Sequence, residues 1–217
     1  FQRQPRAAAG RDTGECIELR NKFYARAWRI LRPIVLFFLP VELRGTENLE
    51  DEAAILCANH SSAWDPILLV LSMPQSFSLR IMAKKQLFSI PLVRWFLRNM
   101  GVFPVDRGNS DIGAVKTAIT SLRDNWNLLI FPEGTRVKRP GQVMPKSGAG
   151  MMAIRAGVKM VPVFIGTKKR LFRKTPIIFG KPFTPAYTGR KGTAEEYQAN
   201  TDEVMRRVYE LGGVPCL

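Results

Sequence analysis

Short apolar runs alternate with longer, partly apolar segments along most of this chain. Six runs have the length of β-strands and are flanked by turn residues, at 53–58, 79–83, 102–105, 128–131, 160–165 and 176–179. Four longer segments are typical of helices, at 66–73, 86–99, 111–124 and 147–157. This alternation predicts a single α/β domain with a central mixed, mostly parallel sheet flanked by helices. The length of 217 residues suits one such core, without internal repeats.

The expected sheet also predicts where a ligand binds. In open α/β sheets, ligands bind beyond the carboxyl ends of the strands. His60, Arg107 and the segment 133–136 each follow the end of a predicted strand. We therefore expect one site at one edge of the sheet. Pro162 lies within the run 160–165, and a proline there favours an edge strand or the start of a strand.

The segment before the first of these runs has the pattern of an amphipathic helix. At about 100° per residue, one arc is basic and the opposite arc is apolar: Lys22, Arg26, Arg29 and Arg32 against Phe23, Tyr24, Ala27, Trp28, Ile30, Leu31 and Ile34. Such helices lie in a bilayer interface; the alternative is a surface helix packed on the domain. The apolar stretch 33–41 is too short to span a membrane. The pattern leaves open whether 22–39 form one kinked helix or two.

These patterns divide the chain into three parts. We expect a mobile leader at 1–16, an N-terminal amphipathic membrane-associating helical segment at 17–40, and the main domain at 41–217. The leader is rich in Arg, Ala, Gly and Gln and lacks the apolar region of a signal peptide.

The charge balance predicts an anionic partner. Lys and Arg number 33 against 18 Asp and Glu, which gives a formal net charge of +15. Such an excess favours nucleic acid or an anionic membrane surface. The aromatic residues lie among long aliphatic ones and no recognition helix is evident, so we expect a membrane surface and no nucleic acid. The basic tract 168–174 is either part of the docking face or a solvated charged loop.

His60 is the only histidine in the chain. Imidazole changes charge near neutral pH, so His60 is the candidate general base. Asp65 can orient the ring only if a turn separates the two residues, because on one helix they would be about 140° apart. Asp65 followed by Pro66 is typical of a helix N-cap and first turn, so Asp65 is expected to cap the next helix and fold back toward His60. The alternative is that Asp65 is only a cap and His60 only a loop residue.

A polar turn with candidate binding groups follows the run 128–131. Gly134 allows close approach of the backbone to a ligand, Thr135 offers a hydroxyl group, and Arg136 offers a fork of donors that fits phosphate. Arg107 likewise follows the run 102–105.

Four motifs in this order resemble those of the glycerolipid acyltransferases, especially the bacterial lysophosphatidic acid (1-acylglycerol-3-phosphate) acyltransferases. They are His60-x4-Asp65, the segment 102–107, the segment 131–136 and the segment 161–164. The resemblance runs from about Val41 to Phe183 and includes an expected opening strand at 41–45. The third motif often continues with Ser, where this chain has Val137.

The resemblance implies direct transfer of a fatty acyl group from acyl-CoA or acyl carrier protein to the sn-2 hydroxyl of lysophosphatidic acid. His60 would be the general base and Asp65 would orient it. The phosphate of the acceptor would bind Arg107 and Arg136, with Gly134 and Thr135 completing the turn and Lys84 or Lys85 reaching the same group. Glu133 would bind a glycerol hydroxyl or fix an arginine, and the structural role is favoured.

Other interpretations stay open at this point. Within the same chemistry, the acceptor could be glycerol 3-phosphate, another lysophospholipid or a lipid A precursor. The rival from another class is a non-catalytic basic protein that binds membrane or nucleic acid. No Gly-rich phosphate loop, His/Cys metal cluster or Ser-centred nucleophile elbow occurs in the sequence, so we expect no cofactor, no metal and no covalent acyl-enzyme.

The cysteines bear on the compartment. Cys16, Cys57 and Cys216 have no metal or disulfide spacing, and Cys57 falls in a predicted buried strand. A reducing setting fits, so we expect a peripheral or monotopic protein on the cytoplasmic face of the cell membrane. Acyl-chain length, the choice of thioester donor and oligomeric state have no sequence signature here.

Overall fold

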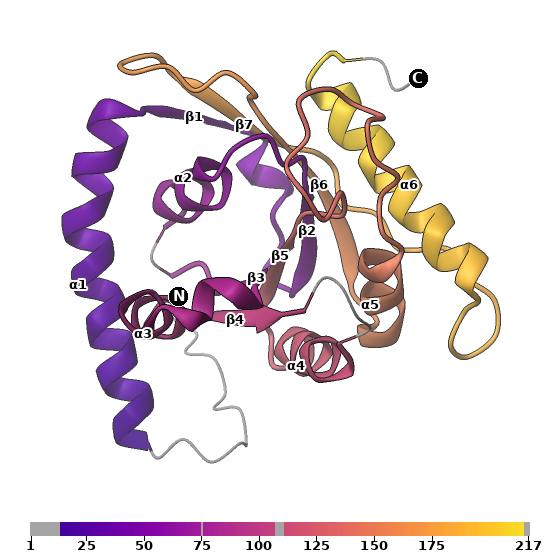
Figure 1. Ribbon diagram of the computed structural model, residues 1–217. Coiled ribbons are helices and arrows are strands. Elements are labelled where there is room, and N and C mark those ends of the chain that lie inside the picture. Colours follow the sequence, from indigo (N-terminus) through magenta and orange to yellow (C-terminus); the bar gives the residue numbers. More distant parts are fainter. Residues whose placement is uncertain (1–13, 75, 107–110, 215–217) are drawn as a thin grey trace.

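The computed structural model describes residues 14–74, 76–106 and 111–214. Its centre is a seven-stranded sheet with the order β1-β7-β6-β2-β5-β3-β4 (Figure 1). The strands are β1 Val41–Arg44, β2 Ala54–Ala58, β3 Leu79–Lys84, β4 Val102–Val105, β5 Asn127–Ile130, β6 Lys159–Ile165 and β7 Thr175–Phe179. Neighbours pair in parallel except β6 and β7, which are antiparallel. The predicted mixed, mostly parallel sheet is confirmed.

Helices cover both faces of this sheet (Figure 1). They are α1 Gly14–Phe38, α2 Trp64–Ser72, α3 Pro91–Asn99, α4 Ile112–Arg123, α5 Gly148–Ala156 and α6 Ala194–Leu211, with 3-10 turns η1 Thr46–Asn48 and η2 Lys85–Ser89. Helices α4, α5 and α6 pack on one face, and α1 and α2 pack on the other. Two hydrophobic cores result, one on each side of the sheet.

The central strands explain why these runs are continuously apolar. Every residue of β2 is buried, and alternate side chains enter opposite cores: Ile55 and Cys57 on the α4–α6 side, Leu56 and Ala58 on the α1–α2 side. A strand buried on both faces has no polar face to alternate with. Cys57 is a fully buried free thiol, and burial raises its pKa well above the usual range.

The expected position of Pro162 at an edge is wrong. It lies within β6, an interior strand between β7 and β2. Its carbonyl accepts the Gly180 N–H at 2.8 Å, just outside the β6–β7 ladder, which joins 163–165 to 177–179. Because the proline nitrogen faces this gap in the ladder, its missing N–H removes no strand pairing. A Cβ on Gly180 would lie 2.8 Å from the proline ring, so glycine is needed opposite it.

Two predicted helices differ in the structure. The segment predicted as one helix at 86–99 is divided into η2 and α3, because Ile90 is extended and Pro91 begins the new helix. The segment 22–39 is one helix to Phe38, with Pro33 inside α1, and this helix already begins at Gly14. Residues 1–13 of the expected leader lie outside the described residues.

The outward face of α1 is not the basic arc of the sequence pattern. Arg32 is half-buried, its Nε donates to the Leu71 carbonyl at 3.0 Å, and its guanidinium lies 4.6 Å from the centre of the Trp28 ring. Ile30 and Ile34, expected on the opposite arc from the cations, are exposed beside Arg26 and Arg29. The side chains of four residues in that prediction lie outside the described part of the chain: Lys22, Phe23, Tyr24 and Ala27.

Helix α6 was not among the predicted elements. Its start carries a capping box in which Thr193 Oγ1 accepts the Glu196 N–H and Glu196 Oε2 accepts the Thr193 N–H at 2.7 Å. Its inner face buries Val204, Val208 and Tyr209 against the α4–α5 side of the core. Across the described residues, no helix combines the length and apolar character needed to cross a membrane.

Candidate active site

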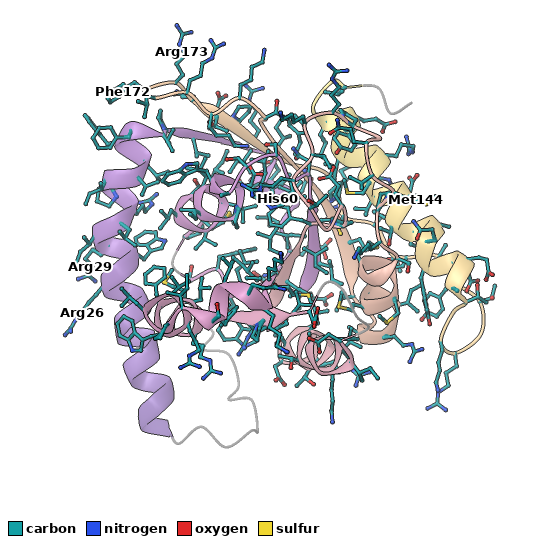
Figure 2. The ribbon with its side chains drawn as sticks, in the orientation of Figure 1. Arg26, Arg29, His60, Met144, Phe172 and Arg173 are labelled. Atoms are coloured by element: carbon teal, nitrogen blue, oxygen red, sulfur yellow. The ribbon has the colours of Figure 1, made fainter. Side chains whose placement is uncertain are left out.

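The loops after β2, β5 and β6 meet at one edge of the sheet, because these three strands are parallel and adjacent. Asn59 joins β2 to β6 there: its side chain donates to the Ile165 carbonyl at 2.9 Å and accepts the Ile165 N–H at 2.7 Å. His60 follows directly, near the middle of the molecule (Figure 2). The predicted arrangement of loops at one edge is therefore present.

His60 and Asp65 are in contact, with His60 Nδ1 3.0 Å from Asp65 Oδ2. The N-cap of α2 is Ala63, so the expectation that Asp65 caps this helix is wrong; it lies in the first turn. Its carboxylate instead points backward, where Oδ2 accepts the N–H groups of Ser61 and Ser62, each at 2.7 Å. The carboxylate thus satisfies two backbone donors of the loop that precedes α2.

Two contacts fix the imidazole of His60, one at its edge and one at its face. Its ring stacks on Phe131 at a centroid distance of 4.3 Å and an angle of 27°. The Asp65 contact uses Nδ1, which leaves Nε2 as the nitrogen to accept a proton from a substrate. The side chain is 12% exposed, so a bound molecule can reach it from one side.

The backbone of His60 is bound by the turn after β5. Its N–H donates to Glu133 Oε2 at 2.8 Å, and its carbonyl accepts the Val137 N–H at 2.7 Å. The contact of Val137 is made by the backbone, so valine in place of the usual serine keeps it. Gly134 has a φ of +66°, and a Cβ there would lie 3.2 Å from the Lys146 side chain.

Glu133 is buried, and its second oxygen accepts the hydroxyl of Tyr209 from α6. Burial raises the pKa of Glu133 above its ordinary value, although the hydrogen bonds from Tyr209 and the His60 backbone lower it. These contacts support a structural role. The partners are the His60 backbone and a tyrosine, whereas the sequence suggested an arginine.

Lys169 contributes a buried charge to the site. Its ammonium forms an ion pair with Asp65 Oδ1 and donates to Ser61 Oγ at 2.7 Å, and its side chain is only 7% exposed. Neither role expected for the tract 168–174, docking face or solvated loop, applies to this residue. Its neighbours in the tract are exposed, so one lysine turns inward from an otherwise exposed loop.

The two charges of this pair shift each other's ionisation. Burial raises the pKa of Asp65, but the hydrogen bond with His60, the charge of Lys169 and the Ser62 N–H outweigh burial, so its pKa lies below the ordinary value. Burial lowers the pKa of Lys169, and the nearby Asp65 only partly offsets this effect. The carboxylate next to the imidazole is therefore ionised at neutral pH.

The cations expected to bind phosphate lie further out. Lys84 ends β3 and Lys85 begins η2; both are exposed at the same edge of the sheet, beyond β5. Thr135 and Arg136 are exposed in the turn after β5. Arg107 lies outside the described residues. Within the described residues, no cluster of three or more His, Cys, Asp or Glu side chains could hold a metal ion.

Several contact residues of the site were not identified as such from sequence, among them Lys169, Tyr209, Phe131 and Asn59. Phe131 and Asn59 adjoin residues of the motifs, so their positions were visible although their contacts were not. Lys169 and Tyr209 carry no local signal, because each reaches the site from a segment distant along the chain.

Comparison with known proteins identifies the family of this chain. The family model described as Acyltransferase matches residues 40–166, more than half of the chain. The chain is 30% identical over 195 residues to the 1-acyl-sn-glycerol-3-phosphate acyltransferase of Bacillus subtilis, covering 88% of this chain and 96% of that protein. It is 33% identical over 156 residues to a chloroplastic 1-acyl-sn-glycerol-3-phosphate acyltransferase of Arabidopsis thaliana, covering 69% of this chain and 43% of that protein.

A Streptococcus pneumoniae 1-acyl-sn-glycerol-3-phosphate acyltransferase is 36% identical over 116 residues, with 52% of this chain and 42% of that protein covered. The matches thus span less than half the length of the Arabidopsis and Streptococcus relatives. The crystal structure of the 1-acyl-sn-glycerophosphate (LPA) acyltransferase PlsC from Thermotoga maritima aligns with a TM-score of 0.60 at 30% identity, covering 94% of this chain and 84% of that one. This chain is therefore a member of the acyltransferase family.

Proposed function

We propose that this protein transfers a fatty acyl group from an acyl thioester to the sn-2 hydroxyl of 1-acylglycerol 3-phosphate, which gives phosphatidic acid. The observation that carries the proposal is the His60–Asp65 pair, held at the carboxyl edge of the sheet by both the side chain and the backbone of His60. The names of the relatives supply the acceptor. The thioester donor is acyl-CoA or acyl carrier protein.

In the proposed reaction, His60 Nε2 takes the proton of the acceptor hydroxyl as the oxygen attacks the thioester carbonyl. Asp65 keeps Nδ1 protonated and stabilises the imidazolium that forms. The tetrahedral intermediate then expels the thiolate, which breaks the C–S bond and leaves the new ester. The thiolate takes up the proton from the imidazolium, so His60 returns to its starting form.

The phosphate of the acceptor is proposed to bind exposed cations around this edge. Lys84, Lys85 and Arg136 follow or begin elements at the carboxyl end of the sheet, and Arg107 belongs to the same proposed set. Arginine forks and lysine ammonium groups both suit phosphate oxygens. Gly134 and Thr135 complete the turn beside Arg136.

We also propose that the protein binds an anionic membrane surface from the cytoplasmic face, as a peripheral or monotopic protein. The support is an exposed stripe along α1, formed by Arg26, Arg29, Ile30, Pro33, Ile34, Phe37 and Phe38. A surface helix of a globular domain normally exposes polar residues on its outer face. Here the outer face combines cations with large apolar side chains, which suits a lipid interface.

A second segment extends this apolar surface. Phe172, from the loop between β6 and β7, packs its ring 5.7 Å from the rings of both Phe37 and Phe38, and its N–H donates to the Phe38 carbonyl at 2.8 Å. Figure 2 shows Phe172 and Arg173 projecting at the end of α1. We call Phe37, Phe38 and Phe172 the aromatic cluster.

The experiment that tests the enzymatic proposal is thioester consumption by purified protein with palmitoyl-CoA and 1-acylglycerol 3-phosphate, in parallel with His60→Ala. General-base assistance is worth about 10²–10⁴-fold, so the variant should lose nearly all turnover while it stays folded. Turnover that depends on the phosphate-bearing acceptor and on His60 supports the proposal. If the wild type binds vesicles but consumes neither this thioester nor an acyl carrier protein thioester with any lysolipid, the proposal fails.

A further inference from the structure

The two oxygens of the Asp65 carboxylate have separate partners. Oδ2 receives His60 Nδ1 and the N–H groups of Ser61 and Ser62. Oδ1 receives the ammonium of Lys169. The Asp65 side chain is 0% exposed, so neither carboxylate oxygen faces solvent. Rotation of the carboxylate would break its contacts without replacing them by water. The orientation of Asp65 toward the imidazole therefore depends on what holds Oδ1.

The loop that carries Lys169 is anchored at both ends. On the β6 side, Ile165 is bound twice by Asn59, and the Gly166 N–H donates to the Pro176 carbonyl at 2.8 Å. On the other side, the Thr175 N–H donates to the Pro40 carbonyl at 2.8 Å. A lysine on a loop fixed in this way delivers its ammonium to a defined point.

Stability alone does not explain this buried lysine. Removing a lysine and a carboxylate from water costs several kcal/mol per ion, and a buried pair is often no better for stability than apolar residues. The ammonium has two partners, Asp65 and Ser61, and both lie on the loop that carries His60. These contacts are those expected of a group that fixes the conformation of the loop carrying His60.

We propose that Lys169 is a positioning residue for acyl transfer, which acts through Asp65 to hold the carboxylate against His60. The proposal rests on the proposed function for its kinetic effect. The ammonium keeps Asp65 ionised although it is buried, and directs Oδ2 to Nδ1. A further charged group near Asp65 is Glu133, from the loop after β5.

Lys169→Met tests this role, with Lys168→Met as the matched control because Lys168 is the exposed neighbour on the same loop. We expect Lys169→Met to lower kcat by about 10–100-fold, because small misplacements of a catalytic group cost up to about 100-fold, with little change in KM for either substrate. Lys169→Arg should recover part of kcat, and Lys168→Met should behave as wild type.

A double-mutant cycle with Asp65→Asn separates positioning from general damage. If Lys169 acts through Asp65, Lys169→Met should cause little further loss in the Asp65→Asn background. The double variant has no unpaired buried charge, so it also remains informative if Lys169→Met alone does not fold. Losses that simply multiply, or a kcat of Lys169→Met equal to that of wild type, would overturn the proposal.

A spectroscopic readout separates this proposal from the enzymatic one. His60 is the only histidine, so its ring protons give one set of NMR signals. At one fixed pH, their chemical shifts report the contact of the ring with Asp65. They should change in Lys169→Met but not in Lys168→Met, whether or not any acceptor is turned over. Unchanged ring signals in a folded Lys169→Met variant would reject the link through Asp65, while absent wild-type turnover would reject only the proposed function.

Discussion

Glu133 and His60 are joined by a hydrogen bond from the His60 backbone N–H to the Glu133 carboxylate, at 2.8 Å. The other oxygen of Glu133 accepts the Tyr209 hydroxyl of α6. The position of the histidine thus depends on a helix that follows the matched family region, which ends at residue 166. The loop is held by groups from three parts of the chain.

The Tyr209–Glu133 contact should be measurable in stability. Tyr209→Phe removes the donor to a buried carboxylate, so we expect a loss of about 1–3 kcal/mol in the free energy of unfolding, measured by urea denaturation. The pKa of Glu133 should rise further, since Tyr209 lowers it. The loss should therefore shrink as the pH falls and Glu133 takes up a proton. Tyr187→Phe, at an exposed tyrosine, is the control, and equal stability of the two variants would contradict the prediction.

The Val137 contact predicts an asymmetry between two substitutions. Val137→Ser keeps the N–H that binds the His60 carbonyl, whereas Val137→Pro removes it. Small misplacements of a catalytic group cost up to about 100-fold, so we expect kcat/KM to fall about 10–100-fold for the proline variant and to change little for the serine variant. Steady-state kinetics and thermal unfolding would be measured together. A serine variant as inactive as the proline variant would show that the valine side chain matters.

The ionised Asp65 carboxylate should contribute to the free energy of unfolding in a pH-dependent way. Its pKa is lowered in the folded protein, so its contribution to stability is complete above the unfolded value of about 3.9 and is lost as the pH falls through the lower folded value. Wild type should lose stability below about pH 4 more steeply than the double variant Asp65→Asn/Lys169→Met, in urea titrations at a series of pH values. Parallel pH profiles would show that this carboxylate does not contribute.

The aromatic cluster predicts weaker membrane binding when it is made polar. Each buried phenylalanine is worth about 1.5–3 kcal/mol, so Phe37→Ser/Phe172→Ser should lower partitioning into phosphatidylglycerol-containing vesicles by about tenfold or more. Vesicle flotation measures this directly. Met144→Ser is the matched control, because Met144 is 78% exposed but lies away from α1 (Figure 2). Equal losses in both variants, or none, would place the membrane contact elsewhere.

Much of the fold could be predicted because it depends on local patterns. The strands at 54–58, 102–105 and 175–179 differ from the predicted runs by at most one residue at either end. Their apolar character is needed for burial whatever packs above them. His60 and Asp65 were placed together for a similar reason, since a short turn can join only a few residues. The position of the site at the carboxyl edge of the sheet could be predicted because parallel strands end at the same edge.

Other features required the folded chain. Pro162 is tolerated inside the sheet only because the β6–β7 ladder has a gap opposite it. Lys169 turns inward while its neighbours remain exposed, because Asp65 and Ser61 are brought beside it. Tyr209 reaches Glu133 across 76 residues of chain. Local hydrophobic periodicity therefore determines which segments become strands and helices, whereas the partners of buried charges depend on which distant groups tertiary packing brings within hydrogen-bonding distance.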